Sequence, residues 1–235
     1  MNTLHVNSID VIRLGLVPYL EAWEFQRRLH QEVADGRRPD TLLLLEHSHT
    51  YTLGRRGRDE DILIGEAVLD QLGIEVHHTD RGGEVTYHGP GQLVGYPIID
   101  LRRWGGGPLK YVRALEQMIA EALAEFGIEG ASEGSPTGVW VKDRKVAAIG
   151  VKVGRRVTTH GFALNVSTDL SYFEHIVPCG MPSARVTSVS RELGRTVGVD
   201  EVIPVVTQKF GRVFGFEPDT AKLSYNPRDG ISAAD

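Results

Sequence analysis

Apolar and polar residues alternate along the chain with the periods of both strands and helices. Alternating or continuous apolar runs predict strands over residues 9–14, 41–45, 93–101, 138–142, 145–153 and 157–166. Apolar residues three and four positions apart predict helices over residues 18–35, 108–127, 169–175 and 201–214. Pro18 and Pro108 open the first two helices, and Asp169 and Asp200 are the expected caps of the last two.

The order of these elements predicts an α+β fold, a mixed β-sheet flanked by helices. Asp143-Arg144 joins two predicted strands and indicates a hairpin, and Gly154 turns the chain into the next strand. Paired strands are typical of a sheet of mixed direction, and a doubly wound parallel sheet fits them less well. No linker-like composition divides the chain. We therefore expect a single domain over residues 1–235, with 216–235 as a poorly patterned tail.

Composition and charge exclude several classes of protein. Of the residues, 41% are apolar and 24% charged, and the net charge of −5 argues against nucleic acid as a partner. No apolar stretch is long enough to cross a membrane, and the first residues lack the pattern of a secretory signal. A single cysteine forms no internal disulfide, so we expect a cytoplasmic protein.

The segment from Asp80 to Gln92 is rich in glycine and in polar side chains that could bind a ligand. Five of the fifteen residues from 81 to 95 are glycine, and Arg81, Thr86, His88 and Gln92 lie among them. Glycine lets the backbone approach a ligand closely, so the segment predicts a binding loop, although a long hairpin connection would also account for it. The spacing matches neither a phosphate loop nor a dinucleotide-binding motif.

Cys179 is the candidate nucleophile. A lone cysteine is most often a small buried apolar residue, but Pro178 and Gly180 place this one on a tight turn. A free thiol is only a few per cent thiolate at neutral pH unless a cation or base lies beside it. Candidate partners are the histidines and lysines of the neighbouring motifs, namely His88, His160, Lys145 and Lys152.

Two predicted strands carry small residues where a ligand could lie. Lys145 begins the first of them and is followed by Ala147, Ala148 and Gly150, while Gly161 follows His160 in the second. On base rates Lys145 would be a solvated lysine and His160 a hydrogen-bonded core residue, and both interpretations stay open. The histidine pairs at 47/49 and 77/78 have no further ligands nearby, so we expect no metal.

Four motifs together resemble one known family, the lipoyl(octanoyl) transferases of bacterial lipoate synthesis. They lie at residues 81–93, 145–150, 160–165 and 176–180, and the likeness spans about residues 10–215 in the family's order. The resemblance implies the fold of the lipoate and biotin protein ligases. It also implies octanoyl transfer from acyl carrier protein to a protein lysine, without a cofactor.

The resemblance assigns roles to matching positions. Cys179 corresponds to the nucleophile that carries the acyl group as a thioester, and Lys145 to the acid/base that shares its proton. His160 and Gln92 are expected to support the site. The implied walls of the acyl pocket are Arg81, Gly82, Gly83, Glu84, Val85, Thr86, Tyr87, His88, Ala148, Ile149, Gly150, Gly161, Phe162 and Ala163.

The resemblance also implies partners. Octanoyl-acyl carrier protein would be the donor, and the acceptors would be the lipoyl domains of 2-oxo acid dehydrogenase acyltransferase subunits and the glycine cleavage H protein. Two alternatives stay open. The chain could be an ATP-dependent ligase of the lipoate or biotin type, which needs no thiol, or a non-catalytic protein that binds lipoyl domains.

Overall fold

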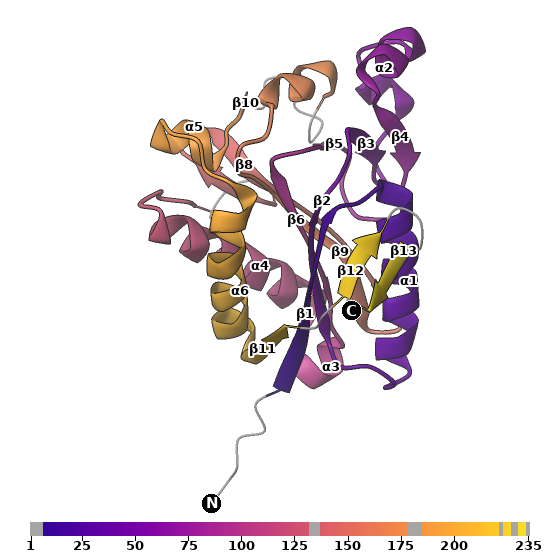
Figure 1. The fold of residues 1–235 in the computed structure, drawn as a ribbon, viewed down its shortest axis with the longest axis vertical. Helices are drawn as coiled ribbons and strands as arrows, with labels where there is room; N and C mark the ends of the chain where they lie inside the picture. The colour runs from indigo at the N-terminus through magenta and orange to yellow at the C-terminus, as the bar shows by residue number, and fades with distance from the viewer. Residues whose placement is uncertain (1–6, 132–136, 178–184, 221–222, 227–229, 234–235) are drawn as a thin grey trace, which may run out of the picture.

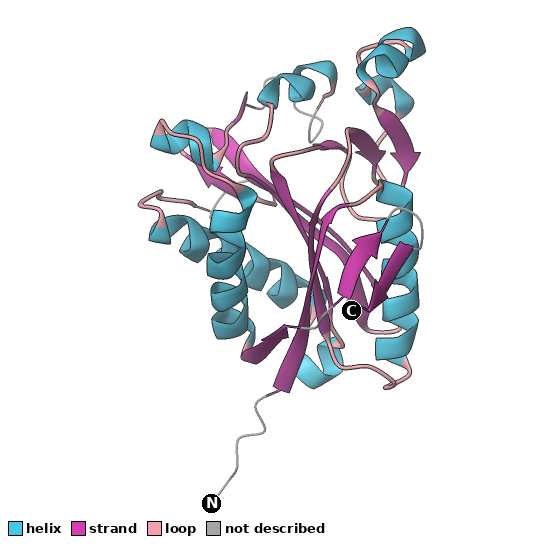
Figure 2. Cartoon of the chain, viewed as in Figure 1, coloured by secondary structure: helices cyan, strands magenta, loops and turns pink. Residues whose placement is uncertain are grey.

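The computed structural model describes residues 7–131, 137–177, 185–220, 223–226 and 230–233, and their strands and helices largely follow the predicted order (Figures 1 and 2). The strands are β1 (Asn7–Leu16), β2 (Thr41–Glu46), β3 (Thr50–Leu53), β4 (Glu75–His78), β5 (Val85–His88), β6 (Gln92–Ile98), β7 (Val139–Val141), β8 (Arg144–Gly154), β9 (Val157–Asn165), β10 (Arg185–Val186), β11 (Phe216–Thr220), β12 (Leu223–Asn226) and β13 (Gly230–Ala233). The helices are α1 (Tyr19–Ala34), α2 (Glu66–Leu72), α3 (Leu101–Trp104), α4 (Pro108–Glu125), α5 (Val189–Leu193) and α6 (Val199–Phe214), with short 3₁₀ helices η1 (Asp59–Asp61) and η2 (Leu170–His175).

An eight-stranded mixed sheet forms the centre of the molecule. Its strand order is β10-β8-β9-β6-β2-β1-β11, and β7 pairs with β8 at the same end. β1 runs parallel to β2 and β11, whereas β2, β6, β9 and β8 are successively antiparallel. α4 and α6 pack side by side on one face of the sheet, and α1 covers the other (Figure 1). No described helix is long and apolar enough to cross a membrane.

Helices on both faces explain why β2 is apolar at successive positions. Leu42 and Leu44 pack into the core under α4 and α6, and Leu43 and Leu45 pack into the core under α1. Because side chains alternate along a strand, a strand covered on both faces needs apolar residues at every position. The predicted buried strand is confirmed.

A smaller sheet, of order β4-β3-β5, stands at one end of the large one. The sequence predicts neither this sheet nor α2, because its strands have four residues each and mix Thr, His and Tyr with few aliphatic residues. The glycine-rich segment is therefore not one continuous loop, since Val85–His88 form β5 and pair with β3.

The structure corrects two predicted boundaries. The strand expected over 93–101 ends at Ile98, and Asp100 caps α3 by accepting a hydrogen bond from the Arg102 N–H at 2.9 Å. α6 begins at Val199, where Glu201 accepts the Gly198 N–H at 2.9 Å, so Asp200 is not its cap.

Residues near the carboxy terminus, for which the sequence shows little pattern, also form strands. β11 pairs in parallel with the first half of β1, and β12 forms a hairpin with β13 beside β1 (Figure 1).

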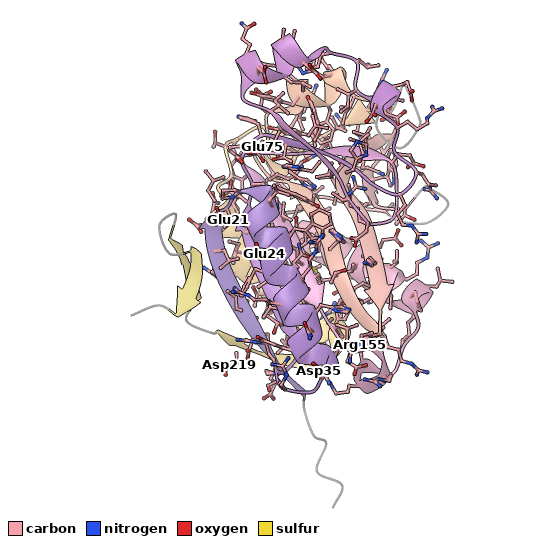
Figure 3. The ribbon with its side chains drawn as sticks, turned by 90° about the vertical axis from the view of Figure 1, so that its right-hand side faces the viewer. Glu21, Glu24, Asp35, Glu75, Arg155 and Asp219 are labelled. Carbon is pink, nitrogen blue, oxygen red and sulfur yellow. The ribbon has the colours of Figure 1, made fainter. Side chains whose placement is uncertain are left out.

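α1 is tied at its end to the turn between β8 and β9. The Arg155 guanidinium lies 2.7 Å from the Asp35 carboxylate, and the two labelled residues lie at the same end of the helix in Figure 3. One turn earlier, His30 Nε2 lies 2.8 Å from the Gly154 carbonyl oxygen. The long β8–β9 hairpin is therefore held against α1 at its tip.

His47 is fully buried where β1, α1 and β6 meet. Its Nδ1 lies 2.7 Å from the Val17 carbonyl oxygen, and its Nε2 lies 2.7 Å from the Tyr96 hydroxyl. A carbonyl oxygen only accepts, so Nδ1–H donates to Val17 and the Tyr96 hydroxyl donates to Nε2. Burial lowers the pKa of His47 to about 4, so the ring is neutral at physiological pH.

We expect acid to destabilise the protein through His47. The unfolded residue takes up a proton near its ordinary pKa of 6.5, whereas the folded ring resists protonation down to about 4, so stability present above pH 6.5 is lost as the pH falls. This residue alone should lower the free energy of unfolding by about 2.5 kcal/mol between pH 7 and pH 4.5. Urea unfolding at both pH values measures the loss.

The matched variant is His47→Gln, which keeps a donor and an acceptor but does not titrate. Its stability should depend less on pH than that of the wild type, although His88 and His160, whose pKa values burial also lowers, retain part of the dependence. An equal pH dependence in both proteins would contradict the role of His47.

Candidate active site

A cavity of about 400 Å³ lies between the β8–β9 hairpin, the glycine-rich segment and the starts of α1 and α4. Its volume falls in the range of small-molecule sites. The lining residues are Tyr19, Arg56, Arg81, Gly82, Gly83, Glu84, Val85, Thr86, His88, Tyr96, Leu109, Val112, Thr137, Lys145, Ala148, Ile149, Gly150, Val151, His160, Gly161, Phe162 and Ala163.

The β8–β9 pairing builds one wall from small residues. Ala148 lies opposite Ala163, and Gly150 lies opposite Gly161. Because small residues face each other across the two strands, space remains beside them. A Cβ at Gly150 would lie 2.9 Å from the Gly82 carbonyl oxygen. Glycine at 150 therefore lets the glycine-rich segment pack directly on the strand.

Arg81 holds the glycine-rich segment to the small sheet. Its buried guanidinium donates to the Thr52 carbonyl at 2.5 Å, the Thr52 hydroxyl at 2.9 Å and the Glu84 carbonyl at 2.9 Å. These bonds fix the path of the backbone between Arg81 and Glu84, which forms the second wall. Arg81 therefore lines the cavity and also holds the backbone of its walls in place.

His88 enters the cavity from β5 with its ring fixed by Gln92. The Gln92 amide donates to the Asn165 side-chain oxygen at 2.9 Å and to the Tyr87 carbonyl at 3.0 Å, so its own oxygen accepts from His88 Nδ1 at 2.8 Å. Burial holds the pKa of His88 well below its ordinary value. The cavity therefore faces a neutral ring, and Gln92 lies behind that ring as a support.

His160 forms a second fixed ring, on β9. Its Nε2 donates to an Asp80 carboxylate oxygen at 2.7 Å, and the other Asp80 oxygen lies 2.5 Å from Lys152 Nζ. The hydrogen bond from His160 lowers the pKa of Asp80, while burial lowers that of His160.

His160 also has a left-handed backbone, with φ of 55°. That conformation is costly for a non-glycine residue and is here stabilised by Gln26, which accepts the His160 N–H at 2.8 Å.

Lys145 lies at the start of β8 with its amino group in the cavity wall. The residue is buried, its Nζ donates to the Thr137 carbonyl at 3.1 Å, and Nζ lies 4.9 Å from the centre of the Trp140 ring. Lys152 is not among the lining residues, and its partly exposed side chain pairs with Asp80.

Cys179 lies outside the described residues, but the chain on either side of its segment is in place. The Val177 N–H donates to the Asp61 carbonyl at 2.8 Å. On the other side Val186 of β10 is in register with Lys145, and the Thr187 N–H donates to the Lys145 carbonyl at 2.9 Å. Arg185 and Val186, which follow the Cys179 segment in the sequence, therefore lie beside Arg144 and Lys145.

Most residues predicted for the pocket line the cavity together, with Tyr87 as the exception. Strand alternation turns Tyr87 away, so that its ring stacks on Tyr172 and its hydroxyl lies 2.7 Å from His49 Nδ1.

Other residues that line the cavity were not predicted from the sequence, namely Tyr19, Arg56, Tyr96, Leu109, Val112, Thr137 and Val151. The only available signal was that two of these residues follow the helix-opening prolines at 18 and 108. The described residues contain no group of three or more His, Cys, Asp or Glu side chains able to hold a metal ion.

Comparisons with known proteins identify the family of the chain. A family model described as "Lipoyl protein ligase A/B catalytic domain" matches residues 18–211. The octanoyltransferase of Solibacter usitatus is 53% identical over 205 residues, covering 87% of this chain and 92% of that protein.

Two solved structures show the fold. A putative lipoate protein ligase from T. acidophilum with bound lipoic acid has a TM-score of 0.67 at 17% identity, covering 91% of this chain and 89% of that one. A biotin protein ligase from Aquifex aeolicus has a TM-score of 0.51 at 15% identity, covering 87% and 68%. The predicted ligase-like mixed sheet is confirmed. The chain belongs to the lipoyl protein ligase A/B catalytic-domain family and, within it, to the octanoyltransferases.

Proposed function

We propose that the chain transfers an octanoyl group from acyl carrier protein to a lysine of a lipoyl domain in lipoate biosynthesis, with Cys179 as nucleophile and Lys145 as proton carrier. The observation that carries the proposal is the buried Lys145 side chain in the wall of a largely apolar cavity. The return of the chain to Lys145 directly after the Cys179 segment supports the pairing of the two residues.

The first half-reaction exchanges one thioester for another. Cys179 gives its proton to the neutral amine of Lys145, and the thiolate attacks the carbonyl carbon of the octanoyl thioester. The bond to the carrier's sulfur breaks, and the departing thiolate takes the proton back from Lys145. The products are the Cys179 octanoyl thioester and the free thiol of the carrier.

The second half-reaction forms an amide. The amine of the acceptor lysine attacks the Cys179 thioester, and Lys145 accepts the proton that the attacking nitrogen loses. The bond between the acyl carbon and Cys179 then breaks, and Lys145 returns the proton to the thiolate. Lys145 thus ends each turnover in its starting state.

The cavity would recognise the acyl chain by burying it. An octanoyl chain buries about six or seven CH₂ groups at ~0.8 kcal/mol each, or roughly 5 kcal/mol of gross binding free energy. Part of this is lost in ordering the chain. Ala148, Ala163 and Phe162 supply apolar wall along the hairpin.

The same proposal extends to the partners and the compartment. The acceptors would be the lipoyl domains of 2-oxo acid dehydrogenase acyltransferase subunits and the glycine cleavage H protein. A thiol nucleophile has to stay reduced, so we expect the enzyme to work in the cytoplasm.

The mechanism predicts a covalent intermediate on Cys179. Mixing the protein with octanoyl-acyl carrier protein without ATP should add about 126 Da, and an apo lipoyl domain should remove it. Cys179→Ser should show no lipoyl-domain-labile adduct. Lys145→Ala should form the adduct at least about 100-fold more slowly, because proton transfer typically contributes that much. Intact-protein mass spectrometry measures all three.

Lys152→Ala is the matched control for Lys145→Ala, since Lys152 lies on the same strand and contacts Asp80. It should acylate at a rate within a few-fold of the wild type. If no adduct forms and a lipoyl domain is modified only with ATP and free octanoic acid, the chain is a ligase.

The second prediction concerns chain length. Ala148→Leu adds three carbons to the cavity wall and should lower kcat/KM for the octanoyl donor about tenfold, since lost burial of one or two CH₂ groups is worth about 1–2 kcal/mol. Activity with a butanoyl donor should change less. Steady-state kinetics with both donors measures the ratio.

Ala124→Leu makes the same change at an exposed position of α4, outside the cavity lining, and should leave both activities unchanged. Equal losses with both donors in Ala148→Leu would contradict the assignment of this wall to the acyl chain.

A further inference from the structure

Glu116 is a buried carboxylate in the middle of α4, close to Lys145 but outside the cavity lining. It is 0% exposed, and its Oε1 accepts the Gly138 N–H at 3.0 Å. Its Oε2 accepts from the Arg113 guanidinium at 2.6 Å, and Arg113 reaches outward with 58% of its side chain exposed. A buried charge is costly unless it is paired and hydrogen-bonded, and Glu116 satisfies both conditions.

The group that Glu116 holds is the peptide unit that also contacts Lys145. The Gly138 N–H and the Thr137 carbonyl belong to one planar peptide. Its N–H points to Glu116, and its carbonyl accepts from Lys145 Nζ at 3.1 Å. A single rigid group therefore joins the Glu116 carboxylate to the Lys145 amino group.

Gly138 makes this arrangement possible. Its φ is 133°, a conformation that other residues rarely adopt, and a Cβ there would lie 2.6 Å from the Ala147 carbonyl oxygen and 3.0 Å from Lys145 Cε. The lysine side chain thus lies directly against the glycine backbone. The orientation of this peptide therefore sets one of the contacts that hold Lys145 Nζ.

We propose that Glu116 is a positioning residue, which fixes the Thr137–Gly138 peptide and through it holds Lys145 Nζ at the reacting end of the cavity. Glu116 lies outside the cavity lining, so its proposed effect passes through the peptide. This inference rests on the proposed role of Lys145, and it adds a residue outside the four motifs.

Glu116 acts through the length of its side chain and through Oε1, which accepts the hydrogen bond. Without it the Gly138 N–H loses its buried acceptor, and the peptide is free to turn its carbonyl away from Nζ. A misplacement of about 1 Å at a reacting group can lower a rate about 100-fold.

Two variants separate reach from charge. Glu116→Gln keeps an acceptor at the same distance and loses the charge, whereas Glu116→Asp keeps the charge and is one methylene too short. We expect Glu116→Asp to lower kcat about 10- to 100-fold with the KM for the octanoyl donor within about twofold, because the cavity wall is unchanged. Glu116→Gln should keep kcat within about threefold. Glu125→Asp, on the exposed end of the same helix, is the matched control and should match the wild type.

Lysine labelling tests the positioning without relying on activity. A short pulse of an acetylating reagent, read by peptide mass spectrometry with exposed Lys110 as internal reference, should modify Lys145 several-fold faster in Glu116→Asp than in the wild type or Glu116→Gln. Thermal unfolding of each variant confirms that it is folded under the labelling conditions.

The outcomes are distinct. If Lys145 labelling and kcat in Glu116→Asp match the wild type, or if Glu116→Gln is impaired as strongly as Glu116→Asp, the positioning role is wrong. If the wild type forms no octanoyl adduct, the proposed function fails, and the labelling comparison still decides whether Glu116 positions Lys145.

Discussion

The pairing of β8 with β9 is the constraint on which the other features of the site depend. Small residues face each other across these strands, so space remains beside the sheet where larger side chains would close it. The same pairing places Lys145 at one end of the hairpin and His160 near the other. Hydrogen bonds to α1 hold the tip, and the cavity wall is therefore set by backbone register more than by flexible side chains.

The polar groups around the cavity are held in neutral or fully paired states. Burial keeps His88 and His160 uncharged, and Gln92 and Asp80 fix which nitrogen of each ring carries its proton. Arg81 directs its donors into the backbone of the walls. Hydrogen bonds to neighbouring side chains and to the backbone thus fix the polar groups that line the cavity.

Much of this molecule could be predicted from the sequence, because the signals were local. The consecutive leucines at 42–45 predicted a strand, which the fold covers on both faces. The motifs at 81–93, 145–150 and 160–165 contain most of the residues that line the cavity. The predictions that failed were those that depended on contacts between residues far apart in the sequence. Tyr87 lies inside a motif yet faces the opposite side of β5, and Leu109 lines the cavity only because α4 starts beside the hairpin. Glu116 looks like an ordinary helix-surface residue until the fold brings Gly138 to it.

The two-residue strand β10 has a consequence for how the protein loses function. It joins the sheet through Arg185 and Val186 alone, at the edge, and on the proposed mechanism it brings the thiol-bearing segment back to Lys145. Edge pairings of this length open at a small fraction of the free energy needed to unfold a core such as that beneath α4 and α6. On that mechanism, mild denaturant should detach β10 while the rest of the sheet remains intact, so that the protein becomes inactive before it unfolds.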